Sequence, residues 1–221
     1  MAKEKFCFAT AMHFVPGPTV RSMISKVRKA LDERTAFEEA KKPGKLHVEL
    51  RDAVKQLDGN ALMARFYCVL KADPMEVLNK ERKEGYRANL KTVRKVRMTA
   101  EYLAGDSTRL NGVCKALFAA TILAARLGKP WVSNNDAEKL LLSLPVTTGN
   151  AELTAALKEL QGMNIENASE ARNQACQFRT AFENLNCYRI ARGNAKDLSA
   201  NGIYANLDSP LIMALADRWG I

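Results

Sequence analysis

From Asp73 to the C-terminus, apolar residues recur every three or four positions, and this helical spacing limits the possible folds more than any other feature. Asp73, Pro74 and Glu76 together are typical of a helix start, where a capping side chain, a proline and an acid are favoured. Residues 86–103 are amphipathic, and residues 110–127 are apolar on most faces, as in a helix at the centre of a bundle. The spacing therefore predicts a mainly α-helical fold, a helical bundle.

After Pro130 the sequence predicts further helices and one loop. The helices run from near Ser133 to before Pro145, from about Ala151 to Gln161, from Asn167 through Leu185 and from Ser209 through Trp219. The loop covers residues 192–208, which are rich in Asn, Gly, Asp and Ser. The last helix carries Leu211, Ile212 and Leu215, which can be buried in the same chain or in a neighbouring one.

The N-terminal part follows a different pattern. A helix is expected from Thr19 to the Pro43-Gly44 stop, and alternating or β-prone segments predict strands around it. The predicted strands cover residues 5–14, 46–50 and 61–70. Asp58-Gly59 is a hairpin turn signal between the last two, although a helix continuing through Leu57 is an alternative. We therefore expect a small N-terminal α+β element made of a strand, a helix and a hairpin.

These patterns divide the sequence into three parts. Residues 1–72 form the basic α+β element, residues 73–130 a basic helical region and residues 131–221 a near-neutral helical region. The last two can form one continuous domain. A membrane span is not expected, because the longest apolar segment, residues 113–127, contains Lys115 and is shorter than the roughly 20 residues that a span needs.

The cysteines and the first residues bear on the compartment. The five cysteines are odd in number and widely spaced, which favours free thiols in a reducing, cytoplasmic environment. Residues 6–15 follow Lys3 and Lys5 as in a signal peptide, but they contain His13 and end in prolines without a cleavage site. No signal peptide is expected.

The basic residues are unevenly distributed along the chain. The net charge is +10, but residues 1–130 hold 26 basic and 14 acidic side chains, whereas residues 131–221 hold 8 and 10. The whole surplus therefore lies in the first three fifths of the sequence. A surplus of this size is typical of proteins that bind polyanions.

The densest basic segment is residues 80–97, with eight basic and two acidic side chains. In a helix, most of these cations line one side, and Tyr86, Leu90 and Val93 line the other. We call the expected phosphate-binding set the cationic ridge. It consists of Lys80, Lys83, Arg87, Lys91, Arg94, Lys95 and Arg97. Arg28, Lys29, Lys41 and Lys42 are further candidate contacts, and an ordinary solvated helix face is the alternative.

Signatures of catalysis and of cofactors are mostly missing from the sequence. Gly128-Lys129 lacks the remaining residues of a phosphate loop, and no pair of cysteines has zinc-ligand spacing, so neither a cofactor nor a metal is predicted. His47-Val48-Glu49 matches the His-x-Glu part of the nucleobase deaminase motif, but the Pro-Cys-x-x-Cys part does not follow it. His13 and His47 on neighbouring strands remain an alternative, as the acid and base of a metal-independent ribonuclease.

The sequence thus predicts a non-enzymatic protein that binds RNA or single-stranded DNA through the phosphate backbone. It would act as a subunit or coat of a nucleoprotein assembly, with self-association through the C-terminal helical region. One alternative is a regulator of double-stranded DNA, with a helix-turn-helix bend at Gly85 or Gly105-Asp106. The others are the ribonuclease and a protein-interaction module whose charge serves solubility.

Overall fold

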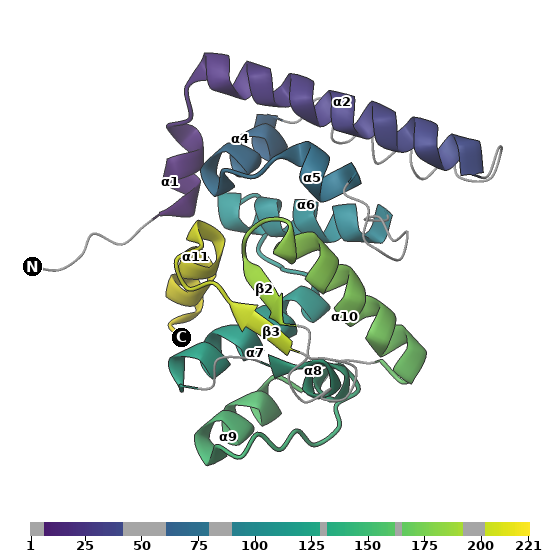
Figure 1. The fold of residues 1–221 in the computed structure, drawn as a ribbon. Coiled ribbons are helices and arrows are strands. Elements are labelled where there is room, and N and C mark those ends of the chain that lie inside the picture. Colours follow the sequence, from purple (N-terminus) through teal and green to yellow (C-terminus); the bar gives the residue numbers. More distant parts are fainter. Residues whose placement is uncertain (1–6, 42–60, 80–89, 129–131, 162–164, 192–201) are drawn as a thin grey trace, which may run out of the picture. The chain divides into compact units, whose positions relative to one another are not determined.

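The structure, a computed structural model, describes residues 7–41, 61–79, 90–128, 132–161, 165–191 and 202–221 (Figure 1). Most of these residues are helical, which confirms the predicted mainly α-helical class. They divide into two compact units, Phe6–Thr108 and Arg109–Ile221. The division falls inside the segment 73–130 that the sequence patterns grouped together.

In the first unit, α4 is the central helix. It contacts α1, α2 and α6, while α2 also contacts α5. The elements are α1 (Phe8–His13), α2 (Gly17–Lys41), α4 (Ala61–Leu70), α5 (Pro74–Asn79) and α6 (Leu90–Ala104). Phe66 and Tyr67 of α4 are almost fully buried, and the Phe66 ring lies 5.7 Å from that of Phe8. The core of this unit therefore forms around α4.

Two predicted strands of the N-terminal element are wrong. Residues 8–13 form α1, in which Phe8 and Met12 are both buried four residues apart. Residues 61–70 form α4, whose buried Met63, Phe66, Tyr67 and Leu70 have helical spacing. In both segments, alternation or β propensity was outweighed by packing of one helical face against neighbouring helices. The predicted strand at residues 46–50 and the Asp58-Gly59 turn lie outside the described residues.

Two predicted helices of this unit are present, although the first begins at Gly17 rather than at Thr19. The helix expected from Thr19 is α2, and its buried face carries Val20, Val27 and Leu31. The Asp73 carboxylate accepts a hydrogen bond from the backbone N–H of Met75 at 2.9 Å, directly before α5. The start of α5 is therefore capped as the sequence indicates.

In the second unit, α7 is the central helix. It contacts α8, α9, α10 and α11 as well as β1 and β3. The elements are α7 (Gly112–Arg126), β1 (Val132–Ser133), α8 (Asn134–Leu141), α9 (Ala151–Glu159), α10 (Ala168–Glu183), β2 (Tyr188–Ala191), β3 (Gly202–Ala205) and α11 (Pro210–Trp219). The predicted helices are thus present, and α7 is buried on most faces as expected. Leu211, Ile212 and Leu215 of α11 are buried within the same chain.

A small antiparallel sheet completes the second unit, in the order β1-β3-β2. Val132 pairs with Ile203, and Arg189 pairs with Tyr204. The sequence predicts a loop at residues 202–205, because residues 192–208 are rich in Asn, Gly, Asp and Ser. Pairing on both edges and the complete burial of Ile203 stabilise β3 nevertheless.

Aromatic side chains join this sheet to the helices. The Phe118 ring of α7 lies 4.7 Å from Phe182, 4.9 Å from Phe178 and 5.8 Å from Tyr188. The Tyr188 hydroxyl lies 3.0 Å from the hydroxyl of Thr121 on α7, so its polar end is satisfied inside the core. These contacts fix β2 and therefore the hairpin that it forms with β3.

Two further findings concern the chain as a whole. The five cysteines are free thiols, of which Cys114 and Cys187 are buried. Within the ranges given above, no helix has the length and apolar character needed to cross a membrane.

Candidate nucleic-acid interface

The described part of the cationic ridge lies on α6 and is not uniform. Arg94 is exposed, whereas Lys95 is only 5% exposed. The Arg97 guanidinium is bound to Glu101, with its Nε 2.7 Å from the carboxylate oxygen. Lys91 lies in α6, but its side chain is outside the described part, as are residues 80–89 with Lys80, Lys83 and Arg87.

The burial of Lys95 has a structural cause. Helix α6 contacts both α4 and α1, so more of its circumference is covered than a single apolar stripe requires. Thr92, Val96 and Thr99 lie on the same side of the helix as Lys95, and all three are buried. The sequence indicated one covered face, and the tertiary packing covers a second one.

A better exposed set of cations lies on α2. Arg21, Lys26, Arg28 and Lys29 are all exposed, and α2 contains no acidic residue before Asp32. We call these four residues the cationic half of α2. Lys41 is the last residue of the helix, with a side chain outside the described part, and Lys42 lies outside the described residues.

The order of charges along α2 is the reverse of what helix stability favours. The N-terminal end of a helix attracts negative charge and its C-terminal end attracts positive charge. In α2 four cations come first, and the second half holds Asp32, Glu33, Glu38 and Glu39 together with Arg34 and Lys41. The opposite face packs on α4 and α5 through residues such as Val27 and Leu31. The first half of α2 therefore displays a net positive charge to solvent.

The two histidines of the ribonuclease alternative are not brought onto strands. His13 is the exposed last residue of α1, and His47 lies outside the described residues. Because His13 lies on a helix, it cannot belong to the neighbouring strands that the ribonuclease alternative requires. Within the described residues, no group of three or more His, Cys, Asp or Glu side chains could hold a metal ion.

The expected helix-turn-helix bend at Gly105-Asp106 ends α6. Gly105 has φ +90°, and the N–H groups of Asp106 and Ser107 donate to the carbonyl oxygen of Glu101. The next helix, α7, belongs to the other unit, so this turn does not join two helices of one unit. Gly85 lies outside the described residues.

A different set of helices meets part of what this alternative requires. In the second unit, α8 and α10 contact each other and α7, and the hairpin of β2 and β3 follows α10. The segment from 142 to 167 between α8 and α10 includes α9, so it is longer than the usual turn. Ser169, Arg172 and Asn173 are exposed on α10, and the Arg172 Nε lies 3.2 Å from Glu138.

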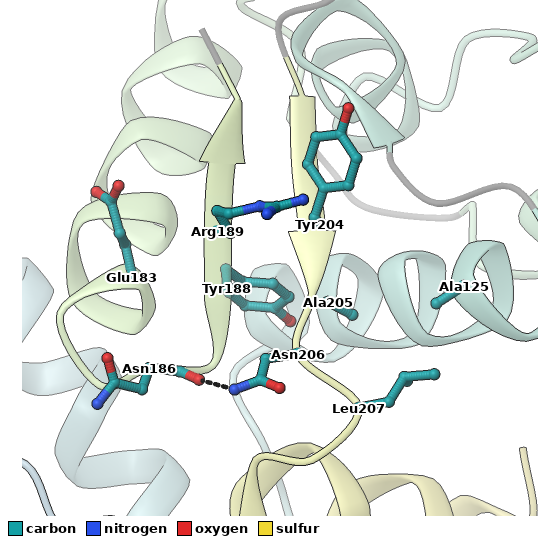
Figure 2. A pocket seen from close by; sticks show the side chains of 9 residues that line it. All are labelled: Ala125, Glu183, Asn186, Tyr188, Arg189, Tyr204, Ala205, Asn206 and Leu207. Carbon is teal, nitrogen blue, oxygen red and sulfur yellow. Dashed lines mark hydrogen bonds between the residues drawn. The ribbon is translucent and has the colours of Figure 1, made fainter.

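A hollow of about 800 Å³ lies beside the hairpin (Figure 2). The residues around it come from the ends of α7 and α10, from both strands and from the segment after β3. They are Ala125, Glu183, Asn186, Tyr188, Arg189, Tyr204, Ala205, Asn206 and Leu207. Figure 2 shows the Arg189 side chain reaching across from β2 towards the Tyr204 ring on β3. The guanidinium carbon lies 5.3 Å from the ring centroid.

Two hydrogen bonds and burial hold the rim of this hollow. The side-chain amide of Asn206 donates to the carbonyl oxygen of Asn186 at 2.9 Å, and its oxygen accepts from the N–H of Asp208 at 3.2 Å. Burial raises the pKa of Tyr188 well above its ordinary value of 10.0, although the hydrogen bond with Thr121 opposes this shift. Tyr188 is therefore a neutral structural residue, whereas Arg189 is exposed and Tyr204 is half-buried. The sequence patterns indicated neither residue, because Tyr204 lies in the predicted loop 192–208 and Arg189 lies between that loop and the helix predicted through Leu185.

The chain was also compared with known proteins. No family model, no curated protein and no solved structure matches it.

Proposed function

We propose that the protein is a non-enzymatic nucleic-acid-binding protein that holds RNA or single-stranded DNA chiefly by its phosphate groups. The observation that carries the proposal is the cationic half of α2, with four exposed cations and no acid among them. Arg21 and Lys29 are eight residues apart, so the set spans about 12 Å along the helix axis.

The second support is the charge of the first unit. Residues 6–108 hold 20 basic and 13 acidic side chains, whereas residues 109–221 hold 12 and 10. Arg94, exposed on α6 of the same unit, adds a contact from the predicted ridge. Phosphate contacts of this kind give affinity without base selectivity, which suits a subunit or coat of a nucleoprotein assembly.

The test is the salt dependence of binding. Five phosphate contacts, four on α2 and one at Arg94, predict that log affinity falls against log salt with a slope of about −3.5 on a single strand, at about 0.7 per contact. The triple variant R21E/R28E/K29E should reduce that slope to about −1.4, because three contacts are lost. Fluorescence anisotropy with a labelled oligonucleotide measures both slopes.

The matched control reverses charges further along the same helix. Asp32→Lys with Glu33→Lys alters two exposed side chains of α2, and it should leave the affinity equal or increase it. If the triple variant binds with wild-type affinity and slope, or if the wild-type affinity does not depend on salt, the proposal is wrong.

The second candidate function is the reading of duplex DNA by α10. It is favoured by the packing of α8 and α10 on α7 and by the hairpin that follows, because a helix held in this way can place one face in the major groove. Arg and Asn are the side chains that most often read guanine and adenine edges, and Arg172 and Asn173 are exposed on this helix. The Arg172 pair with Glu138 is largely solvent-exposed on the arginine side and so is weak enough to be exchanged.

Competition between duplex and single-stranded oligonucleotides distinguishes the two candidates. If α10 reads duplex DNA, the duplex should compete better, and R172A/N173A should abolish its advantage. Glu152→Ala, an exposed change on α9, is the control. If single strands compete better and R172A/N173A binds normally, the α10 candidate is rejected.

A further inference from the structure

We infer that the hollow beside the hairpin binds one unstacked nucleotide of a single strand, with its base stacked on Tyr204 and its phosphate against Arg189. This inference rests on the proposed function and adds a second contact in a different unit of the chain. The ligand class is a nucleotide with both base faces accessible, as in RNA loops or single-stranded DNA.

The register of the hairpin places the two side chains on its outer face. Arg189 lies directly opposite Tyr204 in the antiparallel pair. The adjacent residues of each strand, Tyr188 and Ile203, are buried on the inner face, at 4% and 0% exposure. Because side chains alternate along a strand, Arg189 and Tyr204 share the accessible face. A cation and an aromatic ring are thereby presented together to solvent.

The pair has the chemistry needed for both halves of a nucleotide. A guanidinium binds phosphate oxygens in a planar geometry and also stacks on rings, and a half-exposed tyrosine ring offers a surface for a base. Their present contact, at 5.3 Å, is an exposed cation–ring interaction of the weaker kind. A base and a phosphate can therefore replace it at little cost.

The size and the surroundings of the hollow also suit one nucleotide. Its volume of about 800 Å³ lies within the range of small-molecule sites, about 300 to 1,000 Å³. Leu207 is 44% exposed and gives an apolar part to the rim. Glu183 also lines the hollow. The Asn206 hydrogen bonds hold the rim in place before a ligand arrives.

A duplex base cannot use this surface in the same way. Both faces of a paired base are covered by its neighbours in the stack, so a ring can reach one only after the base has left the helix. The hollow therefore predicts a preference for single strands. The α2 cations alone would not produce such a preference, because they contact phosphates.

The experiment uses the full chain, a fluorescein-labelled oligo-uridine strand and a duplex of the same length. Tyr204→Ala should lower affinity for the single strand by about 5- to 150-fold, the loss expected for one stacked base, and leave the salt slope unchanged. Arg189→Gln should reduce the slope by about 0.7. Tyr204→Phe keeps the ring and should bind like the wild type. Arg218→Gln, an exposed arginine on α11, is the matched control and should not change the slope.

A second readout does not depend on variant folding. When the strand carries 5-iodouridine, ultraviolet light should cross-link it to Tyr204 in the wild-type protein, as mapped by mass spectrometry. A cross-link elsewhere with none at Tyr204 would overturn the inference, even if Tyr204→Ala fails to fold.

The remaining outcomes separate this inference from the proposed function. If the α2 triple variant weakens binding and Tyr204→Ala does not, the nucleotide site is wrong and the proposed function stands. If neither change affects binding, both are wrong. If Tyr204→Ala weakens single-strand and duplex binding equally, the ring is not stacking on an unpaired base.

Discussion

Arg94 and Lys95 are neighbouring cations that look equivalent in the sequence but differ in burial. Arg94 and Lys95 both belong to the cationic ridge, yet Arg94 is exposed and Lys95 is 5% exposed. A charged side chain contributes to phosphate binding only if it can reach the phosphate, and a buried one instead contributes to the packing of its helix. The two residues therefore have different expected roles.

We expect Lys95→Glu to lower the free energy of unfolding by about 1–3 kcal/mol, because it places a carboxylate in a buried site occupied by a cation. Arg94→Glu makes the same charge change on the surface, so the stability should change by no more than about 0.5 kcal/mol while nucleic-acid affinity falls. Urea unfolding and anisotropy measure the two effects. Equal losses of stability in the two variants would contradict the difference in burial.

The cysteines differ in reactivity for a similar reason. Hydrogen bonds with Thr10, first from its side chain and then from its backbone, lower the pKa of the exposed Cys7 thiol. Burial raises the pKa of Cys187 from 9.0 to about 12. We expect Cys7 to react first with iodoacetamide under native conditions and Cys187 to react only after unfolding, as measured by mass spectrometry. Early labelling of Cys187 would contradict this order.

The same shift predicts a pH dependence of stability. The folded state keeps the Cys187 proton to a higher pH than the unfolded state, so its contribution is complete below about pH 9 and is lost as the pH rises towards about 12. Denaturant unfolding across this window should show falling stability. Cys187→Ala should show a shallower fall, because the buried tyrosines still contribute in the same direction. An identical pH dependence in the variant would contradict the assignment to Cys187.

At the scale of elements, burial of one helical face decides between helix and strand where the local sequence is compatible with both. In α4, Met63, Phe66, Tyr67 and Leu70 can be buried together only if the segment is helical. Phe66, Tyr67 and Val69 favour a strand by propensity, but the packing of α4 against three helices outweighs that preference.

The start of α10, which the sequence predicts at Asn167, offers a test of a capping residue. The Asn167 side chain accepts hydrogen bonds from the N–H groups of Ser169 at 2.7 Å and Glu170 at 3.4 Å. Asn167→Ala should lower the free energy of unfolding by about 1 kcal/mol, because both donors lose their partner. Asn173→Ala, exposed in the same helix, is the control and should change stability little. Thermal unfolding of the two variants gives the comparison.

At the scale of the whole molecule, charge and fold are divided between two units. The first unit carries most of the positive balance and the cationic half of α2, and the second carries the sheet and the hollow. Each has its own buried helix at its centre, α4 in one and α7 in the other. The two proposed contacts thus belong to separate structural modules.

This division predicts how fragments behave. A fragment of residues 109–221 should unfold cooperatively on its own, because its core residues contact one another within the unit. A fragment of residues 1–108 should retain most of the salt dependence of nucleic-acid binding, since it holds the α2 cations. Circular dichroism and anisotropy test these points. A fragment 109–221 with the full salt slope would show that the charge distribution does not locate the interface.

The sequence by itself determined the helical class, most helix positions in the second unit and the concentration of positive charge before residue 130. Helical spacing of apolar residues and capping residues are local signals, so they can be recognised without knowing the tertiary contacts of the segment. The tertiary structure decided which cations are exposed, that segments such as α1 are helical, and that Arg189 meets Tyr204 on a hairpin. These outcomes depend on contacts between residues far apart in the chain, and local patterns do not contain that information.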